Sequence, residues 1–321
     1  IDSSLLACYM HELAGKKVKA FNVSFADKSI DESLFAQKVA GSLDLDLITL
    51  RLEDITVENF SSSIYHADQP LGDSAIIPTY LIAKSIGQHV KVVLSGEGAD
   101  ELFHGYDHYR YEKYFYQLGK LPFEGARTLM HLISGMGPHK FDRIRNKLRS
   151  IGSFKNDTGV SRWTSILSPE LSRNYLKTSK QNEGNYEIQF QNFLQGFGKK
   201  SGKLESSLML DLLTWLPDDL LVKTDRMMMA CSVEARTPFL DHHLVEEVLR
   251  SSSHFNQPLF QSKNYLRQLL KKKLPASVSE LISNRPKQGF ETPKLQWLSS
   301  SLYELSSFLF SIKLMILVKG I

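Results

Sequence analysis

The stretch VVLSGEGADELF at residues 92–103 runs from an apolar tripeptide into a cluster of small and acidic residues. Residues 90–94 are typical of a buried strand, and residues 99–103 are typical of the first turn of a helix. Open parallel sheets bind their ligands outside the carboxyl ends of the strands, which is where residues 95–98 stand. We therefore predict a ligand site at this turn.

The part of the sequence before this turn alternates between helix and strand patterns. Apolar residues at helical spacing predict helices over 2–13, 31–42 and 73–86, and apolar runs predict strands over 18–25, 43–50 and 90–94. Helices that alternate with strands indicate a parallel sheet covered on both faces, so we predict an α/β fold with a doubly wound parallel sheet.

From about residue 105 the pattern changes to long helical stretches, among them 206–216, 220–231 and 266–273. We predict an α/β part over 1–105 and a largely helical part over 106–321, joined too closely to be independent domains.

Charge, cysteine content and hydropathy limit the partners of the protein. The 321 residues carry a formal net charge of +4 that is spread along the chain, so we expect no nucleic-acid partner. The two cysteines, Cys8 and Cys231, lack metal-ligand spacing and indicate a reducing, cytoplasmic location. The apolar segment 308–318 is interrupted by Lys313 and is shorter than a membrane span of about 20 residues, so we predict a packed helix and no membrane contact.

Two glycines and three carboxylates stand together in the turn at 95–101. Glycines let backbone N–H groups approach a phosphate closely, and the N-terminus of the following helix favours negative charge. Carboxylates repel a phosphate unless a cation stands between, and Mg²⁺ binds through one or two carboxylates together with phosphate oxygens. The turn therefore indicates a nucleotide with a metal ion, with the alternative that Asp100 and Glu101 only complement the helix dipole.

A second polar cluster opens the sequence. Asp2, Ser3 and Ser4 stand at the start of the first predicted helix, where an ordinary N-cap would have the same residue types. This stretch also resembles the end of the pyrophosphate-binding loop Ser-Gly-Gly-x-Asp-Ser of the ATP pyrophosphatase (PP-loop) superfamily, without its first three residues.

Three further stretches resemble motifs of the glutamine-hydrolysing asparagine synthetases. They are SGEGADELFHGY at 95–106, LPDDLLVKTDRMMMACSVEARTPFLDHHLVE at 216–246 and RPKQGF at 285–290. With the N-terminal stretch they occur in the family's order and extend from residue 1 to about 298. The resemblance to the synthetase domain of this family implies one adenine nucleotide alpha hydrolase-like domain over 1–321, with the nucleotide bound by its α/β part.

The resemblance also implies an ATP-dependent ligase. Members of the family join a carboxylate to the α-phosphate of ATP, release pyrophosphate, and let ammonia attack the acyl-adenylate to give an amide and AMP. The expected substrates are ATP, aspartate and ammonia derived from glutamine, the expected cofactors are ATP and Mg²⁺, and the expected product is asparagine. A homodimer is compatible with the resemblance.

The resemblance assigns the metal and the pyrophosphate to the two polar clusters. Asp2 and Asp100 match the Mg²⁺-binding acids, and Ser3 and Ser4 match residues that hold the pyrophosphate. Positions that contact the nucleotide are matched by Ser95, Gly96 and Val23. From the pattern alone, Val23 is an ordinary core residue of a strand.

Three residues match catalytic positions. Glu97 matches the acid that takes a proton from the attacking ammonium, Arg226 matches a cation near the phosphates, and Lys287 matches the lysine beside the departing pyrophosphate. Without the resemblance, Arg226 would be part of a surface salt bridge worth about 0–1 kcal/mol, and Lys287 would be a solvated loop cation. Glu234, Arg236 and Asp241 are expected to be architectural and not catalytic, with the acid–base pair fixing a helix end by buried ion pairing.

Two parts of the family pattern are missing: the Ser-Gly-Gly of the loop and the N-terminal glutaminase domain. We therefore expect the chain to be part of a longer protein in which that domain is its partner. Relatives with the same motifs close β-lactam or lasso-peptide rings or amidate sugar acids, so the carboxylate stays open, and the missing glycines leave open a non-catalytic nucleotide-binding module. A tRNA-modifying adenylase would need a dense basic face, which the sequence lacks.

Overall fold

The computed structural model describes residues 1–28, 30–52, 55–69, 71–106, 109, 208–209, 211–251 and 262–284. The chain divides into two compact units, one comprising Ile1–Phe103, Thr214–His254 and Lys263–Ile321, the other comprising His104–Leu213 and Phe255–Ser262. In the second unit, the buried Tyr109 hydroxyl donates a hydrogen bond of 2.5 Å to Asp211 Oδ2. The helix predicted over 308–318 lies outside the described residues.

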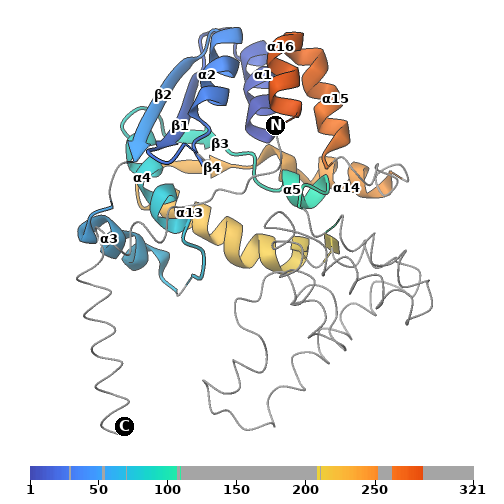
Figure 1. The fold of residues 1–321 in the computed structure, drawn as a ribbon. Helices are drawn as coiled ribbons and strands as arrows, with labels where there is room; N and C mark the ends of the chain where they lie inside the picture. The colour runs from blue at the N-terminus through green and yellow to red at the C-terminus, as the bar shows by residue number, and fades with distance from the viewer. Residues whose placement is uncertain are drawn as a thin grey trace, which may run out of the picture. The chain divides into compact units, whose positions relative to one another are not determined.

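The strands of the first unit pair in parallel, as predicted. Strand β1 (Lys19–Phe25) pairs with β2 (Asp46–Leu52), with Lys19 opposite Asp46 and Phe25 opposite Leu52. Strand β3 (Val92–Leu94) pairs with β4 (Glu234–Arg236), and Figure 1 shows both pairs. Among the described residues the strands form two two-stranded sheets, so the fold is mixed α/β with short parallel sheets, and a continuous doubly wound sheet stays a prediction.

Helices cover both faces of the β1–β2 sheet. Val23 and Phe25 share a hydrophobic cluster with Ile76 of α4 (Ile76–Ile86), whereas Ala20 packs in a different cluster with Val39 of α2 (Ser33–Ser42). Successive side chains of a strand point to opposite faces. The position of Ala20 differs from those of Val23 and Phe25 by odd numbers, so its side chain points to the opposite face from theirs. Each of the two faces of the sheet therefore packs against a helix of its own.

The remaining helices lie before, between and after the strands. The helix predicted at the N-terminus is α1 (Asp2–Ala14), and α3 (Val57–Ala67) was not predicted although Thr56 Oγ1 caps it by accepting from the Asn59 N–H at 3.1 Å. The others are α5 (Ala99–Leu102), the π-helical η2 (Asp211–Leu221), α13 (Val222–Met229), the short η3 (Pro238–Leu240), α14 (His242–Arg250), α15 (Asn264–Lys273) and α16 (Ala276–Ser283).

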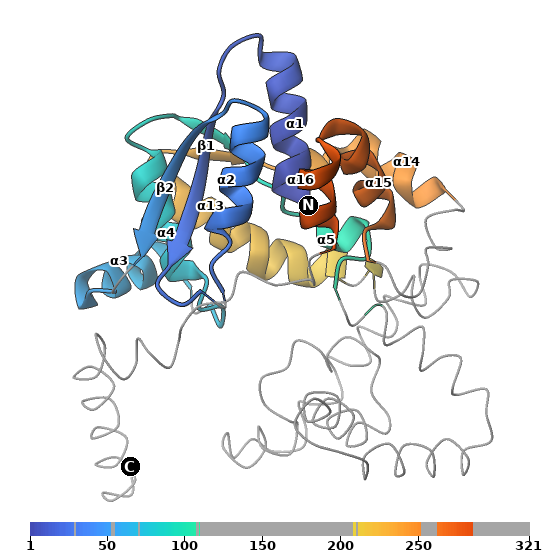
Figure 2. The ribbon, with the colours of Figure 1, turned by 45° about the horizontal axis from the view of Figure 1, so that its top comes forward.

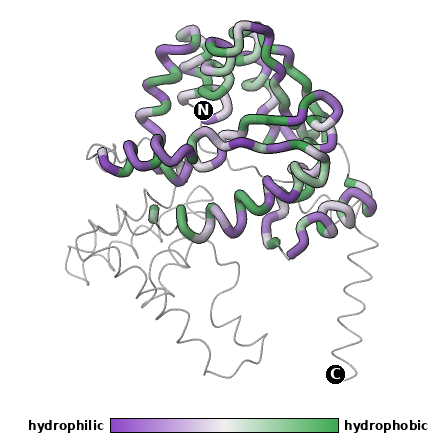
Figure 3. Tube along the Cα trace, turned by 180° about the vertical axis from the view of Figure 1, so that it is seen from behind, coloured by the Kyte–Doolittle hydropathy of each residue, from purple (hydrophilic) through white to green (hydrophobic). Residues whose placement is uncertain are grey.

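Two groups of helices surround the strands of the first unit. Helix α13 packs against α3, α4 and β4, while α15 packs against α1 and α16, and α16 also contacts α2. Figures 1 and 2 show α1, α15 and α16 side by side and α13 near α4. In Figure 3, hydrophobic and hydrophilic residues alternate along the helices, as expected for helices that bury one side.

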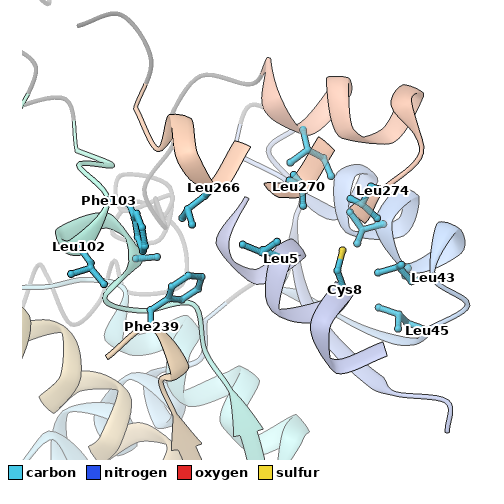
Figure 4. Packing of buried hydrophobic residues seen from close by; sticks show 14 residues of the cluster. Leu5, Cys8, Leu43, Leu45, Leu102, Phe103, Phe239, Leu266, Leu270 and Leu274 are labelled. Carbon is cyan, nitrogen blue, oxygen red and sulfur yellow. The ribbon is translucent and has the colours of Figure 1, made fainter. Parts of the chain in front are cut away.

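The largest hydrophobic cluster joins the start of the chain to its later segments. Leu5 and Cys8 of α1 pack in it with Leu43, with Phe239 of η3 and with Leu270 of α15. Figure 4 shows these side chains in one cluster. This packing fixes the N-terminal end of α1, where Asp2, Ser3 and Ser4 lie, relative to η3 and α15.

The predicted ion pair of Glu234 and Arg236 forms, but it is not buried and fixes no helix end, whereas Asp241 is architectural as predicted and caps α14 by accepting from the His243 N–H at 3.0 Å. Arg236 Nε donates to Glu234 Oε1 at 2.8 Å, but both side chains are more than half exposed and both residues lie in β4. Residues two apart on a strand share a face, so the pair forms on the solvent-exposed face of β4 and fixes no helix end. No helix in the described segments is long and apolar enough to cross a membrane.

Gly98→Ala is expected to destabilise the protein by about 2–5 kcal/mol. Gly98 has φ 84°, which costs a side-chain-bearing residue about 1–2 kcal/mol, and its added Cβ would lie 2.2 Å from Leu240 Cδ2, an overlap that costs about 1–3 kcal/mol more. Chemical denaturation monitored by circular dichroism measures the loss.

Two glycines of the same unit serve as controls for this variant. Gly15 has φ 59° with nothing within 4 Å of an added Cβ, so Gly15→Ala should cost only about 1–2 kcal/mol. Gly41 in α2 is equally open and has no positive φ, so Gly41→Ala should stabilise by about 0.5–1 kcal/mol. A loss at Gly98 no larger than at Gly15 would contradict tight packing against Leu240.

Cys8 is expected to resist alkylation in the folded protein. Its side chain is 1% exposed, and burial, with the nearby Glu12 carboxylate, raises the pKa of the thiol to about 11, so little reactive thiolate is present at mildly alkaline pH. Peptide mapping after iodoacetamide treatment should find the half-buried Cys231 modified first, and both cysteines modified in denaturant. Faster modification of Cys8 than of Cys231 would show that α1 is not packed as described.

Candidate nucleotide and metal site

Three stretches that are far apart in the sequence meet at the carboxyl end of β3. The Ser95 N–H donates to Arg236 O at 2.8 Å, which continues the pairing of β3 with β4 by one residue. A Cβ added at Gly96 would lie 3.0 Å from Asp2 Cβ and 3.2 Å from Ser3 N, so the turn touches the start of α1. The turn predicted as a ligand site therefore adjoins the N-terminal polar cluster and the strand that carries Arg236.

The two acids predicted to bind metal share one partner. Lys263 Nζ lies 2.7 Å from Asp100 Oδ1 and also forms an ion pair with Asp2 Oδ2. Lys263 immediately precedes α15 and has a left-handed backbone with φ 53°. Asp2 opens α1 and Asp100 lies in the first turn of α5, so three helix starts meet around this lysine.

The Lys263 ammonium stays charged in this setting. Its side chain is only 4% exposed, and that burial by itself would lower the pKa of the lysine. The two neighbouring carboxylates outweigh it and raise the pKa above its ordinary value. The cluster thus contains two partly buried acids and one buried cation, a formal excess of one negative charge if all three are ionised.

Asp2 and Asp100 are suitable ligands for Mg²⁺. Both are carboxylates that contact the same atom, Lys263 Nζ, and so lie close together. Asp2 Oδ1 is buried without a hydrogen-bond partner among the described residues. In the described part of the chain no group of three or more His, Cys, Asp or Glu side chains could hold a metal by itself. Mg²⁺ typically takes one or two protein carboxylates and completes its coordination with phosphate oxygens and water.

Ser3 and Ser4 lie beside these acids in the first turn of α1. Ser3 is exposed and Ser4 is half-buried, and the Ser3 N–H lies next to Gly96. The first N–H groups of an α-helix have no acceptor within the helix and attract anions. An anion bound here would contact the first N–H groups of α1, next to the turn that contains Gly96.

Glu97 belongs to a second buried group of charges. One of its carboxylate oxygens, Oε1, accepts a hydrogen bond from the Thr224 hydroxyl of α13, while Oε2 is buried without a hydrogen-bond partner in the described segments. Lys223 directly precedes Thr224 in α13. It forms an ion pair of 2.6 Å with Asp73 Oδ2, and its side chain is 7% exposed. Asp73 Oδ1 in turn accepts from the Ala75 N–H at 2.9 Å ahead of α4.

The pKa of Glu97 is raised above its ordinary value. Burial is the main cause and the Asp73 charge adds to it, whereas the Thr224 hydrogen bond and the Lys223 charge lower the pKa. Asp219 of η2 has a raised pKa for similar reasons: burial first, then the charge of Asp73, opposed by Lys223. Lys223 and Asp73 therefore act on both acids.

The remaining predicted residues are placed as follows. Arg226 is half exposed on α13, and its guanidinium lies 3.7 Å from Asp68 Oδ2, so it forms the surface salt bridge that its sequence context suggests. Val23 is 7% exposed and packs in the cluster with Met227. Ser95 Oγ accepts weakly from the Glu97 N–H at 3.4 Å. Lys287 and the RPKQGF stretch lie outside the described residues.

Sequence reasoning missed five residues of the two charge groups: Lys263, Lys223, Thr224, Asp73 and Asp219. A signal existed for two of them, because Lys223 and Thr224 precede Met227 and Met228 by four residues and so share their buried face of the helix. A lysine on an apolar helix face predicts a buried partner. For Lys263 and Asp73, both in connecting segments, the sequence offers no such periodicity.

Comparison with known proteins shows which family the chain resembles. The family model described as asparagine synthase matches residues 1–311. Asparagine synthetase (glutamine-hydrolyzing) 1 of Bacillus subtilis is 30% identical over 315 residues, which cover 95% of this chain and 47% of that protein. A putative asparagine synthetase (glutamine-hydrolyzing) of Mycobacterium tuberculosis is 30% identical over 269 residues, 83% of this chain and 38% of that protein.

Similarity also extends to proteins with a different name. Amidase chyE of Penicillium rubens is 24% identical over 329 residues, which cover 89% of this chain and 45% of that protein. The chain thus spans about half the length, or less, of the curated relatives it matches. Since the family model matches nearly the whole chain, the chain belongs to the asparagine synthase family, a family of ATP-dependent ligases.

Proposed function

We propose that the protein carrying this chain activates the side-chain carboxylate of aspartate with ATP and Mg²⁺ and then amidates it, giving asparagine, AMP and pyrophosphate. The observation that carries the proposal is the meeting of Asp2 and Asp100, from the starts of two helices, on one centre beside the turn after β3. Membership of the asparagine synthase family supports the ATP-dependent ligase chemistry.

The first step forms the acyl-adenylate. An oxygen of the substrate carboxylate attacks the α-phosphorus of ATP, the bond from that phosphorus to the bridging oxygen breaks, and pyrophosphate leaves. Mg²⁺, held by Asp2 and Asp100, would neutralise charge on the departing pyrophosphate. The first turn of α1, with Ser3 and Ser4, binds the leaving group through N–H and hydroxyl donors.

Other residues assist this step in the proposal. Ser95, Gly96 and Val23 bind the nucleotide, and Lys287 provides a cation beside the pyrophosphate. Arg226 provides a second cation, for which its guanidinium must turn from Asp68 toward the phosphates; both side chains are at least half exposed, so the turn breaks only a weak surface contact.

The second step transfers ammonia. The nitrogen attacks the acyl carbon, the carbon–oxygen bond to AMP breaks, and Glu97 takes the proton that the nitrogen loses. Glu97 can accept it only when ionised, and its buried Oε2 is the oxygen that Thr224 leaves open. We propose that a glutaminase domain elsewhere in the longer protein releases this ammonia from glutamine.

A second candidate function is amidation of a different carboxylate by the same chemistry. The fungal amidase matches about as much of this chain as the bacterial asparagine synthetase does, at 24% against 30% identity. In that case the adenylation residues keep their roles and only the acid changes.

Asp100→Asn is expected to lower AMP formation about a hundredfold or more while leaving the fold intact, because it removes a metal-binding charge at nearly the same volume. The assay supplies ATP, Mg²⁺, ammonium and aspartate to the full-length protein and measures AMP and asparagine. Asp44→Asn, a matched exposed acid that pairs with Lys17 at 2.9 Å, should keep the parental rate.

Two other results would change the proposal in different ways. AMP production by Asp100→Asn near the parental rate would contradict the metal role. AMP that appears only with another acid, with no asparagine formed, would keep the adenylation and replace aspartate as the substrate.

The pH dependence of amide formation should follow the pKa of Glu97, which depends on the charged residues around it. The rate rises with pH as Glu97 ionises, through a pKa that lies above its ordinary value. Lys223→Met removes a charge that lowers this pKa, so the acidic limb should move to higher pH; Asp73→Asn removes a charge that raises it, so the limb should move to lower pH.

A comparison between variants removes the titration of ammonium itself, which is the same in every assay. Arg250→Gln, which breaks only the exposed pair of Arg250 with Glu246, is the control and should leave the profile unchanged. Circular dichroism establishes that each variant is folded. If Lys223→Met and Asp73→Asn moved the limb in the same direction, Glu97 would not be the group that titrates.

A further inference from the structure

Lys263 occupies the position between the two carboxylates that the proposed function assigns to the metal. Its Nζ is 2.7 Å from Asp100 Oδ1 and also pairs with Asp2 Oδ2. The lysine side chain is 4% exposed, and the two acids are 18% and 17% exposed, so the group is largely removed from water. None of the sequence motifs included this lysine.

A metal ion and the ammonium cannot hold these oxygens together. Mg²⁺ binds oxygen at about 2.0–2.1 Å and accepts little departure from its octahedral geometry. An ammonium in contact with the same two carboxylates would collide with the ion, and two cations in a poorly solvated space repel each other strongly. Any metal that takes both acids must therefore displace Lys263.

The displaced lysine needs a new acceptor, since a buried ammonium without one is costly. Asp2 and Asp100 are the described acids in contact with it, and a metal would take both. A nucleotide bound at this site brings phosphate oxygens to the same place, and a lysine side chain is long and flexible enough to turn to them. The polyphosphate therefore provides an acceptor for the displaced Lys263 ammonium, which a free metal ion does not provide.

We propose that Lys263 is a built-in competitor for the metal, which excludes a free divalent cation from Asp2 and Asp100 and admits it only together with a polyphosphate. This inference rests on the proposed metal role of the two acids. Lys263 exchanges the carboxylates for phosphate when the metal–nucleotide complex binds, so metal and nucleotide strengthen each other's binding. The site then stays closed to metal until ATP arrives.

The test measures Mn²⁺ binding to the full-length protein by electron paramagnetic resonance of the free ion, with and without α,β-methylene-ATP, which cannot be cleaved at the reacting bond. In the parental protein Mn²⁺ alone should bind weakly and the nucleotide should strengthen it. Lys263→Met should bind Mn²⁺ alone about tenfold more tightly and the metal–nucleotide complex more weakly, because the competitor and the phosphate ligand are lost together.

Three variants make the result specific. Lys263→Arg keeps the charge and should keep the competition, and Lys17→Met, at an exposed lysine paired with Asp44, should change nothing. Lys263→Gln, whose amide can still donate to one carboxylate, makes the same test if Lys263→Met fails to fold. Unchanged binding of Mn²⁺ alone in the neutral variants of Lys263 would overturn the inference.

The failure of the inference is separable from failure of the proposed function. If Asp100→Asn binds Mn²⁺ with the nucleotide as well as the parental protein does, the metal role of the acids is wrong and the inference falls with it. If Asp100→Asn loses that binding while Lys263→Met and Lys263→Gln gain none for Mn²⁺ alone, the metal role stands and only the competition is refuted.

Discussion

The pairing of β3 with β4 brings the parts of the site together. Its register sets Leu94 opposite Arg236, and the Ser95 N–H extends it by one more bond of 2.8 Å to Arg236 O. Beyond that bond both segments leave the sheet. The segment after β3 enters the acidic turn, and the segment after β4 enters η3, where Leu240 fills the space next to Gly98. A slip of this register would move Leu240 away from Gly98 and separate the acidic turn from the segment that follows β4.

The charges around the candidate site account for the divalent cation in the proposed function. The Lys263 group carries two acids and one lysine, and Asp73, Glu97 and Asp219 share the influence of Lys223. Both groups have more acids than cations, which repels a polyphosphate. Burial raises the pKa of Glu97 and Asp219 and so reduces the repulsion without removing it. In the proposed function, a divalent ion that arrives with the phosphates would neutralise the Asp2 and Asp100 carboxylates and so remove the repulsion at this point.

Local patterns predicted the elements that depend on local sequence. The parallel strands at 18–25, 43–50 and 90–94 and the helix ending at Lys273 were all found, with ends shifted by a few residues. Strand β4 was not predictable, because the three residues Glu234, Ala235 and Arg236 have no alternation of their own and are extended only through pairing with β3. Lys263 was missed for the same physical reason: its partners Asp2 and Asp100 are both distant from it in the sequence, and a single lysine before a helix has no pattern.

Gly98 lies between Glu97 and Asp100, two acids with different proposed roles that are three positions apart in the sequence. Its left-handed backbone, φ 84°, turns the chain between Glu97 and Asp100, so that Glu97 faces Thr224 of α13 while Asp100 faces Lys263 ahead of α15. A right-handed residue there would carry the helix back through Glu97 and rotate its carboxylate away from Thr224. Because the space above Gly98 is filled by Leu240, the turn cannot relax outward either. The acid proposed for proton transfer and the acid proposed for the metal are thus held on two sides of one turn, each within its own group of charges.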